Sequence, residues 1–153
     1  MNNLLTQLKV ILLRLRFWIS TQQAMPTQPT QQGQPQPKLP LFFAAIRMYE
    51  GANPANNNPY DFRYYRGGYL PKYGVVKCSS GGFAMFSTLA LGMEYGETCI
   101  TEMIHNHPEW NFLDFFNVYS PVDDNNDPTL YADTVAKEVG AAPTDNLKTT
   151  LGI

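Results

Sequence analysis

The stretch from Ile46 to Arg63 reads Ile-Arg-Met-Tyr-Glu-Gly-Ala-Asn-Pro-Ala-Asn-Asn-Asn-Pro-Tyr-Asp-Phe-Arg. It continues an apolar helical segment, and Gly51 marks the end of that helix. The asparagines before Pro59 cannot continue a helix and predict a turn. This order places the carboxylate of Glu50 at the C-terminal end of a helix, facing a polar turn.

The predicted surroundings of Glu50 have opposing effects on its pKa. Aromatic neighbours and the negative end of the helix dipole would both raise the pKa toward a value suited to proton donation. Arg47, one turn earlier, would lower it if the two side chains form an ion pair. A surface ion pair is the alternative interpretation of an isolated glutamate, so the residues that follow it decide between the two.

Composition and charge limit the class of function. The 153 residues suffice for one domain with a sizeable core plus a tail. Aromatic residues make up 13% of the chain, which suits either a Phe-rich core or a stacking surface for a ring-shaped ligand. Residues 41–153 hold seven basic and thirteen acidic residues, a net charge of −6, so this part is a poor nucleic-acid binder. Cys78 and Cys99 are compatible with one disulfide or with two free thiols.

The first forty residues differ in composition from the rest. Leucine and isoleucine recur at heptad spacing between Leu5 and Ile19, which predicts a basic amphipathic helix over residues 1–19. Its charges interrupt every window long enough to span a bilayer, and its apolar run is too short for a secretory signal. Residues 20–40 are rich in Gln and Pro and predict an extended linker. We expect the helix to dock to a partner chain, with an anionic membrane surface as the alternative.

Residues 41–153 predict one mainly helical α+β domain. The first helix is expected at 41–49. A long helix, capped by Ser87, contains Gly92 and Gly96, each of which costs up to about 1 kcal/mol relative to Ala, so another backbone is expected to pack on that face. Short strands separated by glycine turns are expected at 62–65, 75–78 and 83–86.

Two further helices are predicted by their capping residues. Asn111, with Asp114 three residues later, is expected to begin one of them. Asp127 with Pro128 begins the other, and Gly140 ends it. The remaining C-terminal residues carry weak signals and predict a partly packed tail.

Clusters of potential metal ligands do not have suitable spacing. Cys78, Cys99, His105 and His107 lack the spacing of a zinc site, and no Cys–His nucleophile pair emerges from them. The acidic loop at 123–127 lacks the glycine and the terminal glutamate of a calcium-binding loop. We therefore expect neither a metal nor another cofactor.

Several motifs follow one another in a recognisable order. They are Ala-Ile-Arg-Met-Tyr-Glu-Gly at 45–51, Asn-Asn-Asn-Pro-Tyr-Asp-Phe-Arg at 56–63, Gly-Phe-Ala-Met-Phe at 82–86 with Gly92, and Tyr119-Ser-Pro followed by Asn125-Asn126, Tyr131 and Gly140. This order resembles phage and bacterial cell-wall glycosidases of the lysozyme and lytic transglycosylase superfamily, over roughly residues 41–143. Family sequences usually have Gly-Asn-Leu where this chain has Tyr60, Asp61 and Phe62. The resemblance implies a lysozyme-like domain with a small β-hairpin sheet.

The resemblance implies that Glu50 is the general acid that protonates the glycosidic oxygen between N-acetylmuramic acid and N-acetylglucosamine. In a lytic transglycosylase the same carboxylate then acts as base while the muramyl 6-hydroxyl closes an anhydro ring. A hydrolase needs a second carboxylate roughly 5–9.5 Å away, for which Asp61 is the candidate. Because the usual family residue there is asparagine, we favour the single-carboxylate mechanism. Tyr119 resembles a tyrosine that lies near the glutamate, and a core tyrosine is the alternative.

Four further residues are candidates for substrate binding. Asn58 and Arg63 are expected either to bind substrate amides or to hold the turn. Phe83 and Phe86 are candidates for lining the glycan groove, but one of them must face the core because alternate strand residues point to opposite sides.

The sequence therefore predicts a peptidoglycan-cutting enzyme, such as a phage lysin, attached through residues 1–19 to a virion or to the bacterial cell envelope or periplasm. One alternative is a non-catalytic lysozyme-like structural module that binds the cell wall, which the departure at residues 60–62 favours. Another is a docking protein whose activity lies in the basic helix.

Overall fold

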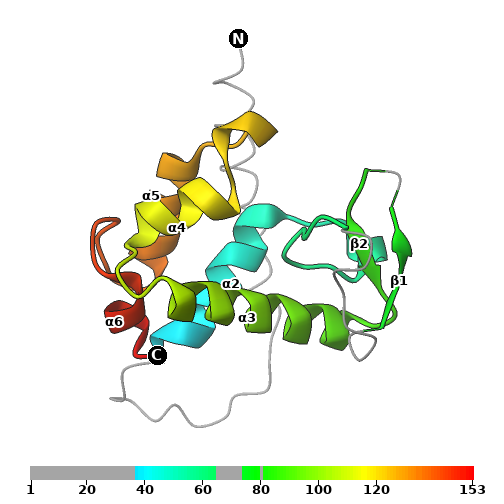
Figure 1. Ribbon diagram of the computed structural model, residues 1–153, viewed down its shortest axis with the longest axis horizontal. Helices are drawn as coiled ribbons and strands as arrows, with labels where there is room; N and C mark the ends of the chain where they lie inside the picture. The colour runs from blue at the N-terminus through cyan, green and yellow to red at the C-terminus, as the bar shows by residue number, and fades with distance from the viewer. Residues whose placement is uncertain (1–36, 65–73, 80) are drawn as a thin grey trace, which may run out of the picture. The chain divides into compact units, whose positions relative to one another are not determined.

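The computed structural model describes residues 37–64, 74–79 and 81–153, apart from the side chains of residues 76–78 and 124. The predicted amphipathic helix and most of the predicted linker lie outside these residues. Pro37–Ile153 form one compact unit. It is mainly helical with a two-stranded antiparallel sheet (Figure 1), as the α+β prediction expects. None of the described helices is long and apolar enough to cross a membrane.

The elements follow one another in the order that the sequence predicts, with additions. They are α2 (Lys38–Glu50), the 3-10 turn η1 (Pro54–Asn56), β1 (Val75–Cys78), β2 (Ala84–Phe86), α3 (Leu89–Asn106), α4 (Phe112–Tyr119), the 3-10 turn η3 (Val122–Asp124), α5 (Pro128–Glu138) and α6 (Leu147–Leu151).

Helix α2 places Glu50 at its last position. It begins at Lys38, three residues before the predicted start, because Pro40 lies in the first turn, where its missing N–H is not needed. The boundary predicted at residue 40 was therefore wrong, and residues 38–40 belong to the domain. Gly51 ends the helix as predicted: it has a φ of +55°, and its N–H donates to the Arg47 C=O at 3.4 Å.

Strands β1 and β2 form a hairpin. Val75 lies opposite Phe86 and Cys78 opposite Ala84, with an irregularity between Val75 and Lys77. The strand predicted at 62–65 contributes only an isolated bridge between Arg63 and Phe83, and its last residue lies outside the described part. The residues that follow the asparagine-rich turn therefore pair with the hairpin just before β2.

Helix α3 extends from the sheet to the helical cluster (Figure 1). Its N-cap is Thr88 rather than Ser87, because the Thr88 hydroxyl accepts from the Leu91 N–H at 3.2 Å. The backbone expected to pack against its glycines is found at Gly92, whereas Gly96 faces an aromatic ring instead. A Cβ on Gly92 would lie 1.8 Å from the Asn57 carbonyl oxygen, and a Cβ on Gly96 would lie 2.1 Å from the Tyr60 ring.

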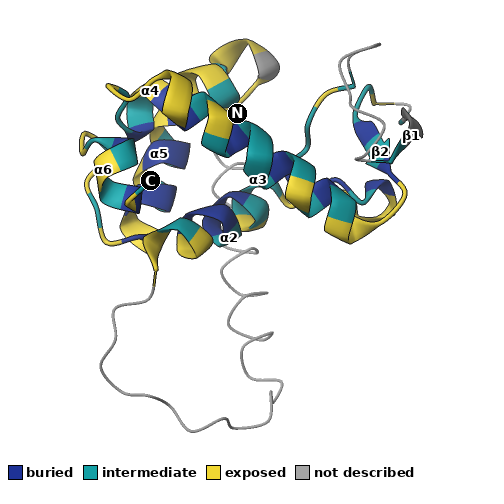
Figure 2. Cartoon of the chain, turned by 60° about the horizontal axis from the view of Figure 1, so that its bottom comes forward, coloured by how far each residue is buried: buried dark blue, intermediate teal, exposed yellow. Residues whose placement is uncertain are grey.

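The core is rich in aromatic side chains, which accounts for much of the aromatic content. Phe42 of α2 contacts three phenylalanines of α4 with ring-centroid distances of 5.8 to 6.4 Å, namely Phe112, Phe115 and Phe116. The buried residues of α2, α4, α5 and α6 face one another (Figure 2). Helix α4 begins with the predicted cap, in which Asn111 and Asp114 each accept from the other's backbone N–H.

The C-terminal segment is more ordered than predicted. Asn146 caps α6, Gly152 ends it with a φ of +73°, and both Leu147 and Leu151 are buried in the core. The tail is packed through these two side chains, as expected, but its helix was not predicted because five residues are too few to show a periodic pattern. Helix α5 ends at Glu138 with Val139 as its C-cap, and Gly140 follows with a φ of +64°, so this glycine ends the helix as predicted.

Candidate active site

A cleft of about 470 Å³ opens beside the C-terminal end of α2. Its lining comes from the end of α2, the segment after η1, the residue before β2, α3, and the end of α4 with the loop that follows. The lining residues are Glu50, Tyr60, Asp61, Phe62, Arg63, Phe83, Met103, Val118, Tyr119, Ser120, Pro121 and Asn126. Among these are the three predicted catalytic residues and two of the four predicted substrate-binding residues.

Glu50 is half-buried in this cleft, and its pKa is raised to about 7. Burial of the carboxylate is the largest cause, because it removes water from the charged form. The negative charge of Asp61 raises the pKa further, whereas a hydrogen bond from Tyr131 lowers it. The carboxyl group is therefore partly protonated near neutral pH.

Arg47 forms its ion pair with Glu97 of α3 rather than with Glu50. The guanidinium Nη1 lies 2.9 Å from Glu97 Oε1 and also donates to the Tyr60 hydroxyl. The ion pair between Arg47 and Glu50, which would have lowered the pKa of Glu50, is therefore not formed.

Tyr131 of α5 is the tyrosine that holds Glu50. Its hydroxyl donates to Glu50 Oε1 at 2.8 Å and lies 3.3 Å from the Ile46 C=O. Its ring is stacked between those of Tyr49, at 3.7 Å, and Phe116, at 4.1 Å. Sequence reasoning noted Tyr131 among the motifs but gave this role to Tyr119, because neither spacing nor periodicity shows which hydroxyl reaches the carboxylate.

Tyr119 lines the cleft, but its hydroxyl donates to the Tyr60 C=O at 2.8 Å. Its ring stacks on Phe115 and meets Phe62 edge-on. Burial raises its pKa well above the usual range for tyrosine. This geometry corresponds to the alternative of a core tyrosine whose hydroxyl is satisfied by the backbone.

Asp61 lies in the same cleft as Glu50, on the turn after η1. It has a φ of +49°, a left-handed conformation that aspartate tolerates better than most residues, and its N–H donates to the Asn58 C=O at 3.2 Å. Burial raises its pKa, and the nearby guanidinium of Arg63 lowers it. Two carboxyl groups with raised pKa values therefore share one cleft.

Asn58 and Phe86 do not line the cleft, and their predicted contact with substrate is corrected. Asn58 is 1% exposed, and its amide donates to the C=O groups of Phe62 and Ala84 while accepting from the Phe62 N–H. Its side chain therefore holds the turn. Phe86 is 2% exposed and packs in the small core under the hairpin, against Tyr95.

Arg63 and Phe83 form one wall of the cleft. The Arg63 guanidinium lies 4.7 Å from the centroid of the Phe83 ring, and its Nη1 lies 3.3 Å from the Gly81 C=O. Phe83 thus faces the cleft while Phe86 faces the core, as strand alternation requires for one of the pair. The wall combines an aromatic surface with a positive charge.

The chemistry available in the cleft is that of carboxyl, hydroxyl and guanidinium groups. Within residues 37–64, 74–79 and 81–153, no three His, Cys, Asp or Glu side chains lie close enough together to hold a metal ion. Cys99 is a half-buried free thiol on α3, and the side chain of Cys78 lies outside the described part.

Comparison of the chain with protein-family models, with curated proteins and with solved structures gives no match. Inferences about function therefore depend on the motifs and on the geometry of the cleft.

Proposed function

We propose that this protein is a lysozyme-like enzyme that cuts peptidoglycan between N-acetylmuramic acid and N-acetylglucosamine, with Glu50 as the general acid. The observation that carries the proposal is a glutamate with a pKa of about 7 that lines an open cleft. A general acid is most effective when its pKa lies near the working pH, and strongly shifted carboxyl groups in clefts are typical of functional sites. The motif order around Glu50 is the second support.

The hydrogen bond from Tyr131 supports an assignment of the transferred proton. Because Tyr131 donates to Oε1 of Glu50, we assign the transferred proton to Oε2. After protonation of the glycosidic oxygen, the same hydrogen bond stabilises the resulting carboxylate. The bond between C1 of the muramyl residue and the protonated glycosidic oxygen breaks, and the 6-hydroxyl oxygen bonds to C1 in its place. The proton of that hydroxyl passes to the Glu50 carboxylate, so bonds and protons balance without a second carboxylate.

Asp61 provides a test between the two reaction types. In a hydrolase it would activate water or stabilise the cationic sugar, so Asp61→Asn would abolish cleavage. In a lytic transglycosylase Asp61→Asn would retain activity and shift its pH dependence, because the charge of Asp61 raises the pKa of Glu50. We favour the second, in which Glu50 alone carries the acid and base steps.

The Arg63 and Phe83 wall fits the binding of a glycan strand. An aromatic face packs against the apolar face of a sugar ring, and a guanidinium pairs with carboxylates such as those of the muramyl peptide. Both residues lie on the cleft with Glu50. They are therefore the proposed substrate-binding residues.

The decisive experiment is digestion of purified peptidoglycan by the full-length protein. Glu50→Gln should lose at least about 100-fold in rate, because general acid catalysis contributes factors of that order. Glu94→Gln, an exposed glutamate of α3, is the matched control and should retain full activity. Mass spectrometry separates anhydro sugars from reducing ends, and intact cleavage by Glu50→Gln would refute the role of Glu50.

A wall-binding module without turnover is the second candidate. Its support is the turn at Tyr60, Asp61 and Phe62, where the motif departs from the family pattern and Tyr60 is buried. Binding of insoluble peptidoglycan by the wild type, with no release of sugar fragments, would favour it. In either case we propose attachment to a virion or to the cell envelope through residues 1–19, and deletion of residues 1–25 tests whether activity resides in that helix.

A further inference from the structure

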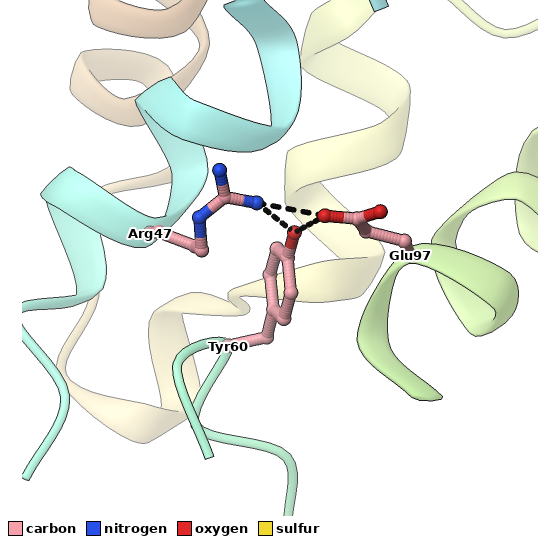
Figure 3. Close-up of polar contacts among 3 residues, drawn as sticks. All are labelled: Arg47, Tyr60 and Glu97. Atoms are coloured by element: carbon pink, nitrogen blue, oxygen red, sulfur yellow. Dashed lines mark hydrogen bonds and ion pairs between the residues drawn. The ribbon is translucent and has the colours of Figure 1, made fainter. Parts of the chain in front are cut away.

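The Tyr60 hydroxyl lies between Arg47 of α2 and Glu97 of α3 (Figure 3). Arg47 Nη1 donates both to this hydroxyl and to Glu97 Oε1. The hydroxyl in turn donates to the same Glu97 oxygen at 3.0 Å. Side chains from α2, from the turn and from α3 thus form one closed set of hydrogen bonds, which we call the Tyr60 network.

The network fixes Tyr60 more than it stabilises an ion pair. The Arg47 and Glu97 side chains are 26% and 37% exposed, so their pairing contributes little by itself. Tyr60 is 2% exposed, and a buried hydroxyl must find hydrogen-bond partners. Its ring lies against Gly96, where even a Cβ would collide with it. Packing and hydrogen bonding therefore define one orientation for this side chain.

The backbone of Tyr60 is held as well. Its C=O accepts from the Tyr119 hydroxyl of α4 at 2.8 Å. The next residue, Asp61, donates its N–H back to Asn58, whose own side chain is buried and hydrogen-bonded. The position of Asp61 is thus determined by contacts of its neighbours with α2, α3, α4 and the hairpin.

The contacts that hold Asp61 in place act against the repulsion between its carboxylate and that of Glu50. Asp61 and Glu50 share the cleft, and two carboxylates repel each other when both are ionised. Arg63 attracts Asp61 as well. Within the part of the chain that the structure describes, the other titratable groups that interact with Glu50 are Tyr49, Tyr119 and Tyr131. They stay neutral near pH 7 because burial raises their pKa values.

We propose that Tyr60, acting with Arg47 and Glu97, is a positioning residue that holds the Asp61 carboxylate beside Glu50. Tyr60 acts through Asp61 and not on the glycan itself. The consequence for catalysis rests on the proposed function, whereas the placement of Asp61 does not. Loss of the Tyr60 hydroxyl removes the hydrogen bonds that hold this side chain to α2 and α3. The Asp61 carboxylate then lies on average farther from Glu50, and Glu50 loses its proton at lower pH.

The test is a ¹³C NMR titration of the Glu50 carboxyl carbon in the full-length protein, assigned by its loss in Glu50→Gln. Asp61→Asn and Tyr60→Phe should each move the Glu50 titration to lower pH. Tyr60→Phe should add no further shift in the Asp61→Asn background, because it acts through Asp61. An unchanged titration in either single variant, or an additive shift in the double variant, overturns the proposal.

Two controls separate positioning from general loosening of the fold. Asn146→Ala removes the N-cap of α6, away from the turn, and should leave the titration of Glu50 unchanged. Glu97→Gln should reproduce the shift of Tyr60→Phe, while Glu94→Gln removes the same charge from α3 outside the network and should not. If Asn146→Ala and Glu94→Gln shift the titration as much as Tyr60→Phe and Glu97→Gln do, the proposal is overturned. Because the titration requires no turnover, its result is independent of whether the protein cuts peptidoglycan.

Discussion

Glu50 combines partial burial with access to a cleft, and this combination has a cost in stability. An unfolded glutamate titrates near pH 4.5, whereas folded Glu50 titrates near pH 7. Between these pH values the folded state binds more protons than the unfolded state, so stability falls as pH rises through that window. The raised pKa thus destabilises the fold at pH 8 and has little effect at pH 4.

Glu50→Gln should therefore stabilise the protein at alkaline pH. We expect a gain of about 2 kcal/mol in the free energy of unfolding at pH 8, after allowing for solvent screening in the open cleft, and little change at pH 4. Thermal unfolding of both proteins across this pH range measures the effect, with Glu94→Gln as the control. A difference that does not depend on pH would contradict the assignment.

Tyr131 should have the opposite effect on the titration of Glu50 from that of Asp61. Its hydrogen bond favours the ionised carboxylate, so Tyr131→Phe should raise the pKa of Glu50 above about 7. The NMR titration measures this directly. Tyr119→Phe is the matched variant and should not raise the pKa, since that hydroxyl bonds the Tyr60 C=O. If the pKa of Glu50 rises in Tyr119→Phe and not in Tyr131→Phe, Tyr119 is the tyrosine that donates to the Glu50 carboxylate.

At the scale of elements, the glycines of α3 determine how the turn beside Glu50 is placed. Gly92 admits the backbone of Asn57, and Gly96 admits the ring of Tyr60. The helix forgoes some intrinsic stability at both positions in order to contact the turn. In return, the turn that carries Asp61 rests on a rigid helix.

Alanine at either glycine should destabilise the domain despite its better helix propensity. We expect a loss of about 1–3 kcal/mol for Gly96→Ala, because a ring can shift slightly, and a larger loss for Gly92→Ala, because the contact there is a backbone carbonyl. Glu94→Ala on the exposed face should change stability by less than about 0.5 kcal/mol. Chemical denaturation measures all three, and wild-type stability in Gly92→Ala would show that α3 does not lie against this turn.

At the scale of the whole molecule, Pro37–Ile153 form a compact unit with an aromatic core. Such a unit is expected to fold without the residues that precede it. A fragment of residues 37–153 should unfold cooperatively within about 4 °C of the full-length protein, a shift that corresponds to less than about 1 kcal/mol. Non-cooperative unfolding of the fragment in calorimetry would show that the first 36 residues are part of the fold.

The sequence by itself determined the features that depend on neighbouring residues. Caps at Asn111 and Asp127, the stop at Gly51 and the mainly helical class follow from local hydrogen bonding and backbone preference, which a short stretch of chain fully specifies. The sequence did not predict the short helix α6, because burial of Leu147 and Leu151 stabilises it and no repeating apolar pattern marks it.

Only the tertiary structure decided which side chains meet. Tyr131 donates a hydrogen bond to Glu50, 81 positions away in the chain, and Arg47 pairs with Glu97, 50 positions away. The Asn58 amide donates to the backbone of the hairpin instead of lining the cleft. Several tyrosines and carboxylates of this chain had equal chemical suitability for those roles. Their distances are set by the packing of α2, α3 and α5, which involves contacts between distant segments that no local pattern encodes.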